Sequence, residues 1–166
     1  ARSAFAIVER VRTGEILAMA CRPAYDLNAF SASSEHERLN RAIGSVYEPG
    51  STMKAAVIAL ALEHGVVTPA TVFDCENGLW TYANRPLHDF HPYGRLTVAD
   101  GVKKSSNILT AKVALILGEK RAYQYLKAFG IGEKMGVDLP GEERGILHHV
   151  ANWSKISLSR IAIGQG

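Results

Sequence analysis

Two short runs of the sequence carry side chains that together could form a nucleophilic site. Ser51 and Lys54 are three residues apart, at the start of an apolar segment that ends at Gly65. Residues at this spacing share one face of a helix, so the Lys54 amine would lie beside the Ser51 hydroxyl. A serine hydroxyl becomes a nucleophile when a neighbouring base accepts its proton. The sequence therefore predicts Ser51 as the nucleophile and Lys54 as its general base.

Lys54 can act as a base only if it is neutral near physiological pH. Residues 55–62 are apolar on nearly every face, which predicts a helix buried in the middle of the domain. Burial lowers the pKa of a lysine from its ordinary value of about 10.4, and the positive end of the helix dipole favours an oxyanion at Ser51. The alternative is an ordinary helix start with a solvated lysine, and the apolar segment argues against it because an unpaired buried lysine is costly.

A second run, Ser105-Ser106-Asn107, offers two hydroxyls and a carboxamide between two predicted helices. Alternation would bring Ser105 and Asn107 to one side, where a hydroxyl near Lys54 could relay a proton. The Asn107 carboxamide can both donate to and accept from a peptide backbone. Serine and asparagine are also favoured N-caps, so the triplet could instead cap a helix that begins near Ile108. The two interpretations are compatible.

The elements that must hold these residues follow from turn and capping signals. Residues 4–11 and 14–20 predict a β-hairpin that turns at Gly14, and residues 21–49 predict a long connection over the surface. Residues 68–93 are irregular, with strand-like pieces near 71–73 and 79–82. Helices are expected over residues 51–64, 97–104, 108–117 and 120–129, with a further short helix over 153–160.

Composition limits the class of protein. The 166 residues are 47% hydrophobic and 21% charged, which suits one globular domain. The net charge of +3 is scattered, so nucleic acid is not implied. The longest apolar run is too short to cross a bilayer, and the first residues do not form a signal peptide. Cys21 and Cys75 lack metal-ligand spacing and could be buried thiols or one disulfide.

Ser-x-x-Lys together with a Ser-x-Asn triplet is the signature of penicillin-binding proteins and serine β-lactamases. The surrounding sequence resembles the transpeptidase domain of class B penicillin-binding proteins over nearly the whole chain. The resemblance implies an α+β fold of the β-lactamase/transpeptidase type, with an antiparallel sheet, a central buried helix and a helical subdomain. The segments that carry it are residues 12–19, 23–28, 40–42, 47–51, 104–107, 129–132 and 163–166.

The same resemblance implies a function for the parent protein. Ser51 would be the acylated nucleophile, Lys54 its general base, Ser105 the proton relay and Asn107 a substrate ligand. The reaction would be attack on the D-Ala-D-Ala amide of a peptidoglycan stem peptide, release of D-alanine and transfer to an amine, and β-lactam antibiotics would acylate the same serine. No cofactor or metal is expected. Such proteins act at the extracytoplasmic face of the bacterial inner membrane, beside glycosyltransferases and division or elongation proteins, and their membrane anchor would lie outside this chain.

One family motif, Lys-Thr-Gly, is absent. Arg12-Thr13-Gly14 is not a substitute because it precedes the nucleophile. We therefore expect residues 1–166 to be the N-terminal portion of a transpeptidase domain, truncated before the C-terminal strands. Those strands would supply the second oxyanion donor, which is usually worth about 2.7 to 4 kcal/mol. Alone, the fragment would be nearly inactive, and one side of the Ser51 helix would be uncovered.

Other functions remain as alternatives. A serine β-lactamase or β-lactam sensor shares the acylation chemistry, and a non-catalytic penicillin-binding-protein-like scaffold would explain the missing motif. A Ser-His-Asp hydrolase is disfavoured because Ser51 does not lie in a G-x-S-x-G turn. A metal site at His88, His91, His148 and His149 also ranks low, since loop histidines are more often solvated or hydrogen-bonded than metal ligands.

Overall fold

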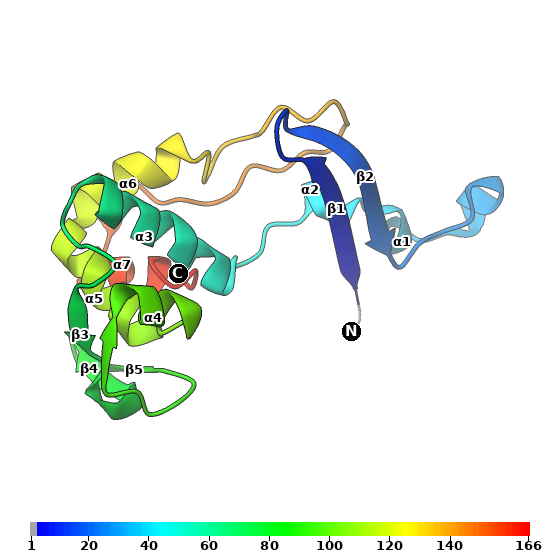
Figure 1. Cartoon of the computed structure of the whole chain (residues 1–166). Helices are drawn as coiled ribbons and strands as arrows, with labels where there is room; N and C mark the ends of the chain where they lie inside the picture. Colours follow the sequence, from blue (N-terminus) through cyan, green and yellow to red (C-terminus); the bar gives the residue numbers. More distant parts are fainter. Residues whose placement is uncertain (1–2) are drawn as a thin grey trace. The chain divides into compact units, whose positions relative to one another are not determined.

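The structure is a computed structural model that describes residues 3–166. The chain folds as two compact units (Figure 1). The first contains the residues up to Tyr47 together with Lys134–Gly145, and the second contains Glu48–Glu133 and Ile146–Gly166. Helices and antiparallel strand pairs are both present, as the α+β class requires.

The first unit is built on the predicted hairpin. Strand β1 (Ala4–Arg10) pairs antiparallel with β2 (Glu15–Arg22), and the register changes at a bulge between Val8 and Glu9. Gly14 has a φ of +74°, and its N–H donates to the carbonyl oxygen of Arg10 at 2.9 Å. The hairpin prediction is confirmed, and Arg12-Thr13-Gly14 forms its turn.

The predicted surface connection differs from the structure because it contains three short helices. They are η1 (Leu27–Ala32), α1 (Glu35–Arg38) and α2 (Arg41–Gly44). Ser34 and Glu37 form a reciprocal capping box at the start of α1, and the Asn40 side chain caps α2. The polar residues that suggested turns are therefore the caps of these helices.

The second unit holds the longer helices. The 3-10 turn η2 (Gly50–Thr52) leads into α3 (Met53–Glu63), and Gly65 follows with a φ of +62°. The expected helices agree with η2 and α3, α4 (Val98–Lys103), α5 (Asn107–Leu117) and α6 (Glu119–Ala128). The expected helix over 153–160 is later and shorter, because η4 (Val150–Asn152) precedes α7 (Ser157–Ile161).

Two small antiparallel sheets complete the second unit beside α5 (Figure 1). Strand β3 (Val72–Asp74) pairs with β6 (Arg95–Thr97), and after η3 (Glu76–Gly78), β4 (Leu79–Tyr82) pairs with β5 (Arg85–His88). Ala83 and Asn84 form the β4–β5 turn with φ values of 48° and 61°. The sequence indicated β3 and β4 but missed their partners, since Ala-Asn lacks the glycine usual in such a turn.

Helices α3 and α5 supply the core of the second unit. Ile108, Leu109 and Val113 of α5 are completely buried. On α3, Val57 and Ile58 are buried, while Ala55, Ala59 and Leu62 are exposed on another face. The uncovered side expected for this helix is therefore present, and α5 is the more completely enclosed of the two.

Both cysteines are free thiols; Cys75 is buried and Cys21 is half-buried. Among residues 3–166, every helix falls short of the length and apolar character needed to cross a membrane.

Candidate active site

Ser51 lies on the exposed turn that opens α3. Gly50 has a φ of +59°, and its N–H donates to the carbonyl oxygen of Gly164 at 3.1 Å. The Ser51 side chain is exposed, and its hydroxyl makes no hydrogen bond to any residue that the structure describes. Thr52 and Met53 have right-handed helical backbone angles, so one helical turn separates Ser51 from Lys54.

Gly164 comes unusually close to this turn. It has a φ of +71°, and a Cβ built on it would lie 2.2 Å from the carbonyl oxygen of Gly50 and 2.4 Å from the Gly50 nitrogen. Only a residue without a side chain fits here, because real Cβ atoms do not approach other atoms so closely. The backbone beside Ser51 is therefore held against Gly164.

Lys54 is 6% exposed, as the apolar context predicts. Its Nζ donates to the carbonyl oxygen of Ser105 at 2.6 Å and to Ser105 Oγ at 3.0 Å. Burial lowers the pKa of the Lys54 amine below its ordinary value, and the negative charge of Asp89 partly opposes this effect. The site therefore combines a lysine biased toward its neutral form with a hydroxyl in hydrogen-bonding contact.

Burial alternates along the triplet Ser105-Ser106-Asn107, which follows α4. Ser105 has a φ of +55° and is exposed, Ser106 is completely buried, and Asn107 is partly exposed. Ser106 Oγ accepts from the Leu109 N–H at 3.0 Å and caps α5. Asn107 Nδ2 donates to the carbonyl oxygen of His88 at 2.7 Å. Ser106 therefore acts as the predicted helix cap, while Ser105 contacts Lys54.

The sequence interpretation missed Asp89, which lies against this triplet. Asp89 Oδ1 accepts from the backbone N–H groups of Asn107 at 2.5 Å and Ile108 at 3.0 Å, and Oδ2 accepts from Ser106 Oγ at 2.7 Å. No local pattern could reveal the contacts, because they join residues 17 to 19 positions apart.

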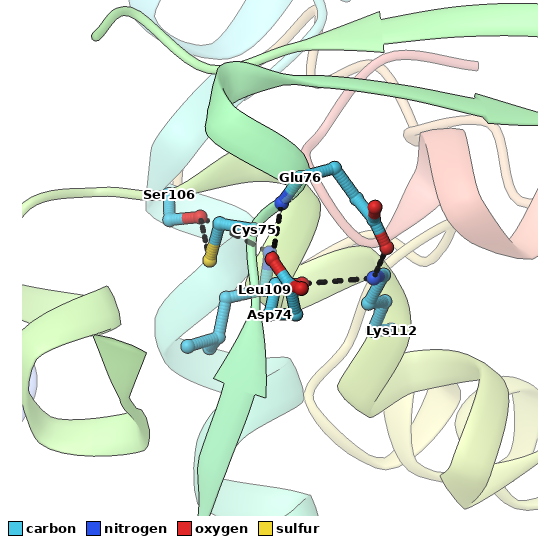
Figure 2. A network of polar contacts seen from close by, with 6 residues as sticks. All are labelled: Asp74, Cys75, Glu76, Ser106, Leu109 and Lys112. Carbon is cyan, nitrogen blue, oxygen red and sulfur yellow. Dashed lines mark hydrogen bonds and ion pairs between the residues drawn. The ribbon is translucent and has the colours of Figure 1, made fainter. Parts of the chain in front are cut away.

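A neighbouring polar network fixes the other side of α5 (Figure 2). Lys112 Nζ donates to the carbonyl oxygen of Asp74 at 2.8 Å and to Glu76 Oε1 at 2.6 Å. The Sγ of buried Cys75 lies 3.6 Å from Ser106 Oγ. Burial, the largest influence, raises the pKa of the Cys75 thiol. The strand and turn around Cys75 therefore contact Ser106 and, through Lys112, helix α5.

The histidines considered as metal ligands have local contacts. His149 Nδ1 accepts from the Ala151 N–H at 3.2 Å, and the His91 ring packs edge-to-face on the rings of Phe90 and Tyr93. Within residues 3–166, no three His, Cys, Asp or Glu side chains gather in a way that could hold a metal ion.

The chain belongs to the penicillin binding protein transpeptidase domain family, whose sequence profile matches residues 4–166. This family assignment agrees with the one that the sequence motifs suggested. The fold also agrees: the structure resembles the crystal structure of a peptidoglycan glycosyltransferase from Burkholderia ambifaria with a TM-score of 0.86, at 32% identity and over 99% of this chain and 48% of that one. The transpeptidase domain of Burkholderia pseudomallei penicillin-binding protein 3 gives a TM-score of 0.85, at 31% identity and over 99% of this chain and 45% of that one.

Curated relatives carry the same kind of name. The chain is 34% identical to the probable peptidoglycan D,D-transpeptidase PenA of Neisseria flavescens, over 100% of this chain and 41% of that protein. It is 33% identical to the peptidoglycan D,D-transpeptidase FtsI of Escherichia coli K12, over 100% of this chain and 28% of that protein. The chain thus spans less than half the length of these relatives.

Proposed function

We propose that the protein is a serine D,D-transpeptidase that cross-links peptidoglycan stem peptides through an acyl ester on Ser51. The observation that carries the proposal is the contact of buried Lys54 with Ser105, one helical turn from an exposed, unpartnered serine. The names of the relatives support the same chemistry. We assign Ser51, Lys54, Ser105 and Asn107 the roles that the family resemblance implies.

In the first half-reaction, Ser51 Oγ attacks the carbonyl carbon of the D-Ala-D-Ala amide while its proton passes to neutral Lys54. The proton then moves through Ser105 Oγ, 3.0 Å from Lys54 Nζ, to the nitrogen of the departing D-alanine. The helix start favours negative charge on the developing oxyanion, which the Ser51 N–H can bind. Asn107 offers its carboxamide to the backbone of the peptide.

In the second half-reaction, an amine from a neighbouring stem peptide attacks the ester. Lys54 accepts the proton of this amine, the bond to Ser51 Oγ breaks, and the serine recovers its proton. The new amide joins the two peptides. A β-lactam ring opens by the same first step, and its acyl group remains on Ser51.

We further propose that residues 1–166 are the N-terminal portion of the transpeptidase domain. The shares of the relatives that the chain covers support this interpretation. The remaining strands would carry the Lys-Thr-Gly motif and the second oxyanion donor, so the segment alone would have little activity. The parent protein would act at the extracytoplasmic face of the bacterial inner membrane, together with a glycosyltransferase and division or elongation proteins.

The test is acylation of the full-length protein by a β-lactam, followed by peptide mass spectrometry. The expected result is one adduct on Ser51, absent from Ser51→Ala. A missing adduct under conditions that label a control penicillin-binding protein would favour the scaffold alternative. Nitrocefin hydrolysis that continues after one equivalent would favour a β-lactamase. Peptide cross-linking, measured with a donor that ends in D-Ala-D-Ala, should disappear in Ser51→Ala.

A further inference from the structure

Asp89 uses both carboxylate oxygens on three consecutive residues at the start of α5. Oδ1 accepts from two backbone N–H groups, those of Asn107 and Ile108, and Oδ2 accepts from the Ser106 hydroxyl. Hydrogen bonds to a carboxylate are stronger than those between neutral groups. The side chain therefore fixes the triplet more firmly than the Ser106 cap alone could.

The loop that carries Asp89 is itself fixed. The Asp89 N–H donates to the carbonyl oxygen of Gly78 at 3.0 Å, and the preceding His88 carbonyl oxygen accepts from Asn107 Nδ2 at 2.7 Å. A Cβ on Gly78 would lie 2.8 Å from the His91 carbonyl oxygen, so the loop and the η3 turn are in close contact. Asp89 is thus a rigid support for the triplet.

Ser105 ends α4 with a left-handed backbone, at a φ of +55°; its N–H donates to the carbonyl oxygen of Val102 at 3.0 Å, and the Ser106 N–H donates to that of Gly101 at 2.8 Å. This conformation is unfavourable for a residue other than glycine and persists only where neighbouring structure imposes it. The same backbone directs both Ser105 oxygens at Lys54 Nζ. Loss of the Asp89 contacts at Ser106 to Ile108 would leave Ser105 held only by the end of α4, so its oxygens would be placed less precisely on Lys54.

We propose that Asp89 is a positioning residue for acyl transfer, which holds Ser105 against Lys54 and fixes the backbone of Asn107. The proposal rests on the function proposed above. Asp89 reaches no reacting atom itself and acts through the three residues that it binds.

The charge of Asp89 has a second effect, which a purely structural residue would lack. Burial lowers the pKa of Lys54, and the Asp89 carboxylate raises it in part. Loss of the carboxylate charge should lower the Lys54 pKa further, so the neutral base would form at lower pH. Asp89→Asn tests this effect separately, because its carboxamide oxygen can still accept from the Asn107 and Ile108 N–H groups.

The experiment measures the second-order rate of Ser51 acylation by a β-lactam in the full-length protein across pH, together with thermal unfolding. Asp89→Ala should reduce the rate about 100-fold, the cost of displacing a catalytic group by roughly 1 Å. Asp89→Asn should be acylated faster than Asp89→Ala, and the rising limb of its pH profile should shift to lower pH than in the wild type. Asp26→Ala is the matched control, because its carboxylate also binds a backbone N–H, that of Asn28 at 2.9 Å, and belongs to the first unit.

Each outcome bears on a different claim. If the wild-type protein is not acylated at Ser51, the proposed function fails before Asp89 is tested. If it is acylated and both Asp89 variants match its rate and pH profile, the positioning role is refuted. The role is also refuted if folded Asp89→Ala and Asp26→Ala lose rate equally. Should Asp89→Ala fail to fold, Asp89→Asn decides alone, and an unshifted pH profile at wild-type rate contradicts the proposal.

Discussion

Replacing Gly164 by alanine should disable the Ser51 turn. The new Cβ would lie 2.2 Å from the Gly50 carbonyl oxygen, and ordinary contact begins at 3.4 Å. The two backbones would have to separate by about 1.2 Å, the difference of those distances. Left-handed alanine costs about 1–2 kcal/mol and overpacking about 1–3 kcal/mol, so the domain should lose about 2–5 kcal/mol of unfolding free energy.

The assay pairs thermal unfolding with β-lactam acylation in the full-length protein. At about 2–4 °C per kcal/mol, Gly164→Ala should lower the unfolding temperature by roughly 4–20 °C. Displacement of Ser51 by about 1 Å should slow acylation about 100-fold at temperatures where the variant is folded. Both effects should appear together, because they have one cause.

Gly65→Ala is the matched control. Gly65 has a φ of +62°, yet a Cβ there would meet no atom within 4 Å. Gly65→Ala should therefore lose only about 1–2 kcal/mol of unfolding free energy, the cost of left-handed alanine, and be acylated at the wild-type rate. If Gly164→Ala is no less stable than Gly65→Ala and acylates normally, the close-approach argument is wrong.

Three further predictions concern Lys54 and the β4–β5 turn. Lys54→Arg should lower the rate of acylation at least 100-fold, since a guanidinium stays protonated and cannot serve as the base; adduct formation with time measures this. Burial lowers the pKa of Lys54 in the folded protein below its ordinary 10.5, so the unfolded chain binds the proton more tightly. The free energy of unfolding should therefore rise as pH increases from the lowered pKa toward 10.5. Urea unfolding at neutral pH and at about pH 10 measures this rise, and Lys54→Met should not show it because methionine does not titrate. Ala83→Gly should raise stability by about 0.5–1 kcal/mol in the same assay without changing acylation, because alanine has a φ of 48° there.

Local signals were enough to predict the longer helices. Gly65 ends α3, Thr97 caps α4, and the apolar spacing of residues 108–117 defines α5. These features depend on residues a few positions apart, so composition and capping rules describe them well. The expected burial of Lys54 came from the same source, since its position in an apolar helix required it.

The sequence could not reveal contacts between distant segments. Asp89 binds Ser106 across 17 positions, and Gly164 meets Gly50 only after the chain has folded. The partner strands of β3 and β4 were missed for a related reason: β5 contains Pro86 and follows an Ala-Asn turn, so its identity depends on pairing. Tertiary contact, which no local spacing encodes, decides each of these features.

The burial of Ser106 separates two ways in which a substitution in the triplet could harm the protein. Ser106 Oγ caps α5, binds Asp89 and touches Cys75, while Ser105 is exposed and Asn107 is partly exposed. A substitution at either outer position would remove a group to which we assign a chemical role and leave the helix start intact. A substitution at the middle position would disrupt the helix start itself. Variants of Ser105 or Asn107 should therefore accumulate as folded but poorly active protein, whereas variants of Ser106 should be lost through misfolding and degradation.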